Sequence, residues 1–105
     1  MTARPTFVRP HLAWFLVLDG GVVATTALAF SDSAHAAASQ AGPVPSRATA
    51  RRLVGLIVFL HVGEALVARR LARRYGLPAG RWARQTLAVG FPSLLALRRV
   101  VRPAG

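Results

Sequence analysis

The sequence predicts an all-α fold, a membrane-spanning bundle of three helices that forms a single domain over residues 1–105. Hydrophobic residues make up 53% of the chain and charged residues only 16%, whereas about a quarter of the residues in a soluble domain are charged. The apolar residues fall into three blocks, and all 14 basic residues, every one an arginine, lie at the edges of these blocks. Each block approaches the ~20 residues that cross a bilayer as a helix.

The first block, residues 12–30, predicts a membrane span. Arg4 and Arg9 precede it, and it contains one charged residue, Asp19. A basic start and an Ala-x-Ala pattern at residues 34–36 are also typical of a cleaved secretory signal. Signals have an apolar run of roughly 7–15 residues, and this run is longer and holds an acid. We therefore favour retention as a span over cleavage after Ala36.

The second block predicts a span over residues 53–69, after a linker of small residues at 31–52. Pro43 and Pro45 in the linker break any helix, and Ser46 is able to cap the next one. No helix breaker follows until Gly76, so the helix is expected to continue into a basic loop at 70–82, with Gly76 in the left-handed cap position.

The third block predicts a span over residues 83–101. Pro92 lies inside it and removes one helical hydrogen bond, a loss that neighbouring groups can make good within a membrane. We expect a kink near Phe91 and not a break.

Three crossings put the N-terminus and the basic loop on one side and the C-terminus on the other. The dense arginines of the loop indicate that its side is cytoplasmic, and so the N-terminus as well. The exclusive use of arginine beside abundant alanine suggests a GC-rich coding sequence, and hence a bacterial plasma membrane. Five arginines are expected to face anionic lipid headgroups: Arg69, Arg70, Arg73, Arg74 and Arg81. Because the arginines flank apolar runs instead of covering a folded face, nucleic acid is not an expected partner.

Polar residues inside the apolar blocks predict one intramembrane polar cluster. An ionisable group in hydrocarbon is energetically costly, so it is expected to have an interaction partner or a functional role. Its expected members are Asp19, His61, Glu64, Gln85 and Thr86. The cluster either fixes helix packing through hydrogen bonds, or binds a polar headgroup or relays a proton. Metal binding is disfavoured, because His61 and Glu64 supply only two ligands and the chain has no cysteine. We expect no cofactor and no catalytic residue.

Ordered motifs in the C-terminal half resemble a known family. They are His61-Val62-Gly63-Glu64-Ala65-Leu66, Gly76, Gly80-Arg81, Trp82-x-x-Gln85-Thr86, Gly90 and Ser93-Leu94. This combination resembles the Transmembrane protein 254 family of small multipass membrane proteins. The resemblance implies a multipass membrane protein and carries no biochemical activity to transfer.

The leading hypothesis is a non-enzymatic membrane component or accessory subunit that packs against a partner protein or its own copies. The sequence has no phosphate-binding glycine loop and no serine beside a convincing base. The alternative is a small lipid-binding or proton-coupled unit that uses the His61 and Glu64 pair. A secreted cationic peptide, released after Ala36, is a third and weaker interpretation.

Overall fold

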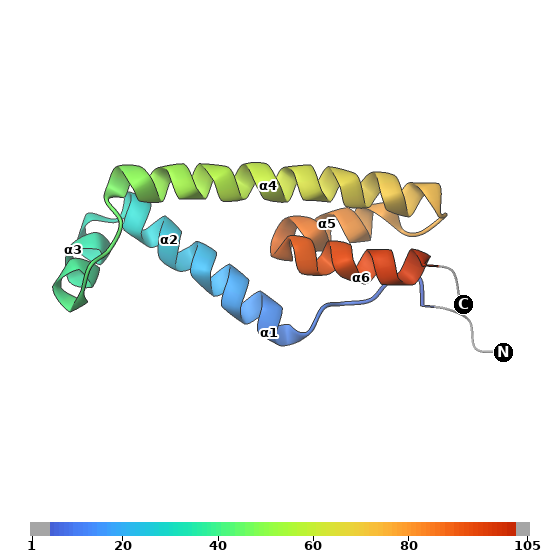
Figure 1. Cartoon of the computed structure of the whole chain (residues 1–105), viewed down its shortest axis with the longest axis horizontal. Helices are drawn as coiled ribbons and strands as arrows, with labels where there is room; N and C mark the ends of the chain where they lie inside the picture. Colours follow the sequence, from blue (N-terminus) through green and yellow to red (C-terminus); the bar gives the residue numbers. More distant parts are fainter. Residues whose placement is uncertain (1–4, 103–105) are drawn as a thin grey trace.

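The computed structural model describes residues 5–102, which form helices joined by short turns, with no strand among them (Figure 1). This confirms the all-α prediction. Arg4, one of the two arginines that precede the first predicted span, lies outside the described residues.

The first helical stretch runs without interruption from Leu12 to Phe30. It consists of α1 (Leu12–Trp14), a wider π-type turn η1 (Phe15–Asp19) and α2 (Gly20–Phe30). Within residues 5–102 this is the one helix long and apolar enough to cross a membrane. It coincides with the first predicted span.

The predicted linker is largely helical. Ser31 has an extended backbone that ends α2, and its hydroxyl accepts a hydrogen bond from the backbone of Ala34 to begin α3 (Asp32–Ala41). Alanine dominates α3, which explains why a segment with no buried residue still forms a helix. The helix-breaking residues Pro43 and Pro45 follow the end of α3.

The second predicted span lies within α4 (Arg47–Arg74). Ser46 caps its start by accepting from the backbone N–H of Thr49, as expected. Gly76 at φ +69° follows its end, and the backbone N–H groups of Gly76 and Leu77 donate to the carbonyls of Arg73 and Ala72. This pair of bonds defines a Schellman cap, which confirms the prediction for Gly76. The apolar part of α4, residues 53–68, is short for a complete span and contains Glu64.

The third predicted span is not one helix. The chain forms α5 (Ala79–Val89) and α6 (Phe91–Val101), and it reverses between them at Gly90, where φ is +78°. Trp82 near the start of α5 packs with Leu97 in α6, while Thr86 bonds to Ser93 nearer the turn. Such pairing defines an antiparallel hairpin (Figure 1). The expected kink near Phe91 is therefore wrong. Pro92 lies in the first turn of α6, where its missing N–H costs nothing.

The arrangement follows from a close crossing of α2 and α4 at one end. Ala29 and Ala50 are fully buried there, and small side chains allow the two backbones to approach. From this point the helices diverge, and the α5–α6 hairpin lies against α4 in the space between (Figure 1). The larger buried side chains lie at the hairpin end, where Trp82 and Leu97 pack on Ala68 and Ala72.

Because α6 returns alongside α5, Arg102 and Pro5 lie at the same end of the molecule and line one pocket. The predicted three-helix bundle, with its C-terminus opposite its N-terminus, is therefore wrong. Among the described arginines, three lie in the first two turns of α4 beside its crossing with α2 (Arg47, Arg51 and Arg52), and the others lie in residues 5–11, in the last turns of α4, and in α5 and α6 with its C-cap.

Candidate membrane-embedded polar site

Two of the five predicted cluster residues, Gln85 and Thr86, lie inside the hairpin. Gln85 is 8% exposed, and Thr86 and Ser93 are fully buried. The side-chain amide of Gln85 donates to the Ser93 hydroxyl at 3.0 Å. Thr86 Oγ1 lies 2.9 Å from Ser93 Oγ and 2.8 Å from the carbonyl oxygen of Trp82.

The Thr86 hydroxyl donates to the Trp82 carbonyl and to the Ser93 hydroxyl, and because it carries one hydrogen, the two contacts share it. The Ser93 oxygen accepts from both Thr86 and Gln85. A buried chain of this kind fixes α5 on α6, and it is the packing arrangement that polar residues commonly provide between membrane helices.

The extended N-terminal segment, residues 5–11, is held against the hairpin by the same elements. Trp82 Nε1 donates to the carbonyl of Thr6 at 2.9 Å, and Gln85 Nε2 donates to the carbonyl of Val8 at 2.9 Å. The Phe7 ring packs on Trp82 at 5.0 Å between centroids. Sequence patterns gave no sign of this contact, because backbone carbonyls 76 and 77 residues away are the acceptors.

His61 lies where the hairpin turn meets α4. Its Nδ1 is 2.7 Å from the carbonyl oxygen of Ile57, and because that oxygen accepts, Nδ1 is the donor. The ring points Nε2 at the turn, at 3.0 Å from the position that a Cβ of residue 90 would occupy. Only glycine allows this approach. On a neutral ring Nε2 is an unused acceptor.

Asp19 and Glu64 flank His61 in two separate pockets. Asp19 lines a pocket of about 340 Å³ with His61, Ile57 and Leu87. Glu64 lines another of about 340 Å³ with His61, Gly90 and Phe91. All three polar side chains are half-buried, and neither carboxylate has a hydrogen-bond partner within residues 5–102. The described residues contain no group of three potential metal ligands.

The five predicted residues are thus distributed over two places. Asp19, His61 and Glu64 surround the outer side of the hairpin turn, while Gln85 and Thr86 bond to Ser93 inside the hairpin. His61 lies against the turn and connects the two places through Gly90. Since no hydrogen bond joins the two sets in the described residues, they work as separate units.

The predicted headgroup-facing arginines are exposed at the hairpin end. Three of them line a shallow pocket of about 560 Å³ beside Leu66 and Val67: Arg69, Arg70 and Arg73. Arg74 follows in the last turn of α4, where it also complements the helix dipole. Arg81 instead lies over the face of the Phe7 ring, at 4.2 Å from its centroid.

Large apolar side chains cover the outer surfaces of the long helices. Phe59 is 74% exposed, Val17 and Val23 are each 69% exposed, and Leu16 is 67% exposed. Large apolar side chains exposed to this degree on two helices are typical of a surface that faces lipid or a partner protein. The helices and their polar interior therefore define a small α-helical membrane protein.

The chain belongs to the Transmembrane protein 254 family, whose pattern matches residues 13–99. This confirms the resemblance seen in the motifs, and the match extends into the first helix as well. Comparison with curated proteins and with solved structures gives no match.

Proposed function

We propose that this chain is a multipass membrane component with two spans, residues 12–30 and α4, and a re-entrant hairpin, α5–α6. It acts without catalysis, by packing against a partner membrane protein or its own copies. The apolar surface of the long helices is the observation that carries the proposal.

The geometry of the hairpin suits a segment that enters and leaves the bilayer on one side. The 11 residues of α5 rise about 16 Å, or half of a ~30 Å hydrocarbon core. Leu87 and Phe91 beside the turn are exposed and apolar. The backbone at Gly90 is satisfied, because its N–H donates to Thr86 and its carbonyl accepts from Ser93. Backbone groups outside a regular helix require hydrogen-bond partners of this kind when they lie inside a bilayer.

Charge supports one orientation. With a re-entrant hairpin, ten described arginines lie on the segments on the side of both described chain termini, namely residues 5–11, the last part of α4, α5 and α6 with its C-cap: Arg9, Arg69, Arg70, Arg73, Arg74, Arg81, Arg84, Arg98, Arg99 and Arg102. The other end has three, and Asp32 pairs with one of them, Arg47. The difference in arginine number between the two sides is much larger in this arrangement than in a three-span topology. It favours a cytoplasmic location for both termini and for the turn after α4.

The outer face of α4 supports packing with another helix. Gly55 and Gly63 flank Phe59 at intervals of four residues, and a Cβ at either glycine would meet nothing within 4 Å. A glycine inside a helix costs about 1 kcal/mol relative to alanine. In membranes, small residues let a second backbone approach closely. The Gly55–Phe59–Gly63 face therefore offers two hollows beside one exposed ring.

Cysteine labelling tests the topology, because the natural chain has no cysteine. Single cysteines at Thr6, Gly80 and Arg102 should react with a membrane-impermeant maleimide from the same side, and one at Gln40 from the opposite side. A three-span chain would instead expose position 102 together with position 40. That second pattern would contradict the re-entrant hairpin.

Purification in mild detergent tests the packing. The full chain should retain a partner protein or migrate as an oligomer, and Gly55→Leu with Gly63→Leu should abolish this association. Val58→Leu and Val62→Leu on neighbouring faces of the same helix are the matched controls and should leave it intact. A wild-type chain that is monomeric and alone, or equal effects of both pairs, would contradict the packing surface.

A second candidate function is a lipid-binding or proton-coupled unit built on His61 and Glu64. The observation that favours it is the pocket that holds both side chains beside the hairpin turn, with the Glu64 carboxylate unpaired within the described residues. Glu64→Gln separates the two functions. Loss of phenotype at normal protein abundance supports chemistry at this pair, whereas loss of abundance supports a role in packing.

A further inference from the structure

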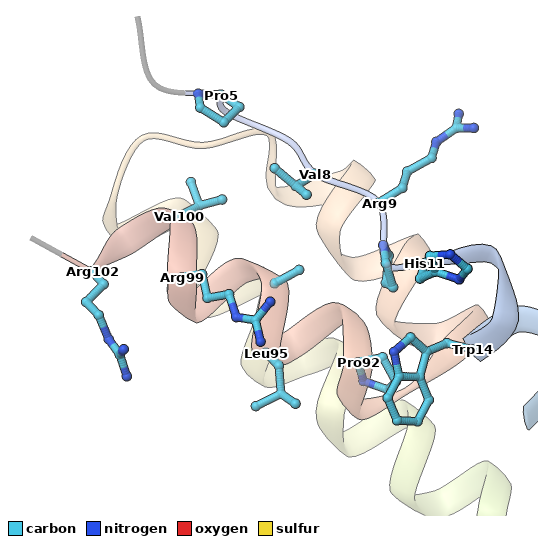
Figure 2. Close-up of a pocket in the computed structure, with 12 residues that line it drawn as sticks. Pro5, Val8, Arg9, His11, Trp14, Pro92, Leu95, Arg99, Val100 and Arg102 are labelled. Carbon is cyan, nitrogen blue, oxygen red and sulfur yellow. The ribbon is translucent and has the colours of Figure 1, made fainter. Parts of the chain in front are cut away.

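A pocket lies between α6 and the N-terminal segment (Figure 2). Its volume is about 620 Å³. One end is apolar, formed by Trp14, Pro92 and Leu95. The Trp14 ring packs edge-on against Phe91 at 5.5 Å and so is held in place. The other end reaches Arg99 and Arg102, while Arg9 and His11 line the side formed by the N-terminal segment.

The two ends lie at different depths. Pro92 follows the hairpin turn, which is the deepest point of the proposed re-entrant segment, whereas Arg99 lies two helical turns later. Seven residues of helix place Arg99 about 10 Å nearer the arginine-rich end. The pocket therefore changes from aromatic and apolar to cationic along the direction in which a bilayer changes from hydrocarbon to headgroup.

The charge of the pocket has one sign. None of the described residues that line it is acidic. Arg99 lines the pocket and lies along α6 in Figure 2, whereas Arg9 extends away from α6. Arg99 is thus placed to contact a ligand directly, and Arg9 adds positive charge at the rim.

We propose that this pocket binds an anionic phospholipid from the surrounding bilayer. Its phosphate contacts Arg99, and an acyl chain lies against Trp14 and Leu95. An arginine guanidinium binds phosphate with two parallel N–H donors, which selects the headgroup by charge and geometry. The site is distinct from the exposed arginines at the end of α4, because it has an apolar floor as well as a cationic rim.

Quenching of tryptophan fluorescence tests the site. The full chain is reconstituted in phosphatidylcholine vesicles that contain a small fraction of phosphatidylglycerol brominated on its acyl chains. Of the two tryptophans, Trp14 is 42% exposed and Trp82 is fully buried, so contact quenching reports on Trp14. Brominated phosphatidylglycerol should quench more strongly than the same fraction of brominated phosphatidylcholine, and Trp14→Phe should abolish the quenching.

Two substitutions on α6 distinguish a site from general surface charge. Arg99→Gln should weaken the preference for the anionic lipid about fivefold or more. Arg98→Gln removes the same charge one residue away, outside the pocket, and should leave the preference within about twofold. Arg99→Lys keeps the charge and should retain most of it. Equal effects of Arg98→Gln and Arg99→Gln, or no anionic preference in the wild-type chain, would overturn the proposal.

The inference rests on the proposed immersion of the hairpin, and the two can fail separately. Cysteine labelling at Thr6, Gly80 and Arg102 reports the topology alone. A chain with the expected labelling and no preference for anionic lipid would refute the pocket and leave the proposed topology standing.

Discussion

Replacing Gly90 with alanine should destabilise the hairpin more than any other glycine substitution in the described part of the chain. The backbone there has φ +78° and ψ −137°, a region that residues with a side chain rarely adopt. Such strain costs about 1–3 kcal/mol. The new Cβ would also lie 3.0 Å from His61 Nε2, so the ring must shift. Together these effects predict a loss of about 2–3 kcal/mol, or roughly 30- to 150-fold in the folding equilibrium.

Two glycines provide matched controls. Gly76 has φ +69° but open space around its Cβ position, so Gly76→Ala carries the strain alone and should cost about 1 kcal/mol. Gly63 is helical with open space, and Gly63→Ala should be neutral or stabilising by up to about 1 kcal/mol. Unfolding in detergent titrated with sodium dodecyl sulfate, followed by circular dichroism, measures all three.

A double-mutant cycle isolates the contact between Gly90 and His61. In a His61→Ala background the close contact is absent, so Gly90→Ala should cost less than in the wild-type chain, by roughly 0.5–1 kcal/mol. The strain at residue 90 remains in both backgrounds. If Gly90→Ala is no more destabilising than Gly76→Ala, or costs the same in both backgrounds, the packing of His61 on the turn is refuted.

Three further changes test the contacts around the hairpin. Thr86→Val keeps the shape but removes a buried hydroxyl that serves two partners, and it should lower stability by roughly 1 kcal/mol in the same titration. Trp82→Phe removes the donor to the Thr6 carbonyl, and it should increase hydrogen exchange in residues 5–11 while α4 keeps its protection. Asp32→Ala breaks an exposed ion pair with Arg47 and should change stability by less than about 0.5 kcal/mol; a larger loss would show that α3 is anchored through it.

Local signals predicted the parts of this fold that depend on a few neighbouring residues. The hydrophobic block at 12–30, the cap at Ser46 and the left-handed turn at Gly76 each follow from short stretches of sequence. The α3 helix is not predicted, because its small residues indicate a linker, although alanine is the strongest helix former. The contact of residues 5–11 with the hairpin depends on the backbone carbonyls of Thr6 and Val8, which no side-chain pattern reveals.

The third block shows why hydropathy alone misleads. Its length fits one span, and Pro92 alone is compatible with a kinked helix. Gly90 followed two residues later by proline is, however, the usual sequence of a helix end. The length of the apolar block favours the opposite interpretation, a single crossing of the membrane. Hydropathy does not reveal a reversal inside an apolar block, because contact with lipid stabilises apolar residues equally in a span and in a hairpin.

The hairpin also determines what its polar residues can do. In a single span, Gln85, Thr86 and Ser93 would occupy neighbouring turns of one helix and would need partners from other helices. The reversal at Gly90 brings Ser93 onto Gln85 and Thr86, so the segment satisfies its own polar groups. Within residues 5–102, Asp19 and Glu64 have no hydrogen-bond partner, and His61 bonds to the Ile57 carbonyl of its own helix. These three residues surround the turn from the other two helices. Chemistry or ligand binding in the interior is therefore to be sought at those three residues, and the hairpin network is to be regarded as the support that positions the turn against His61.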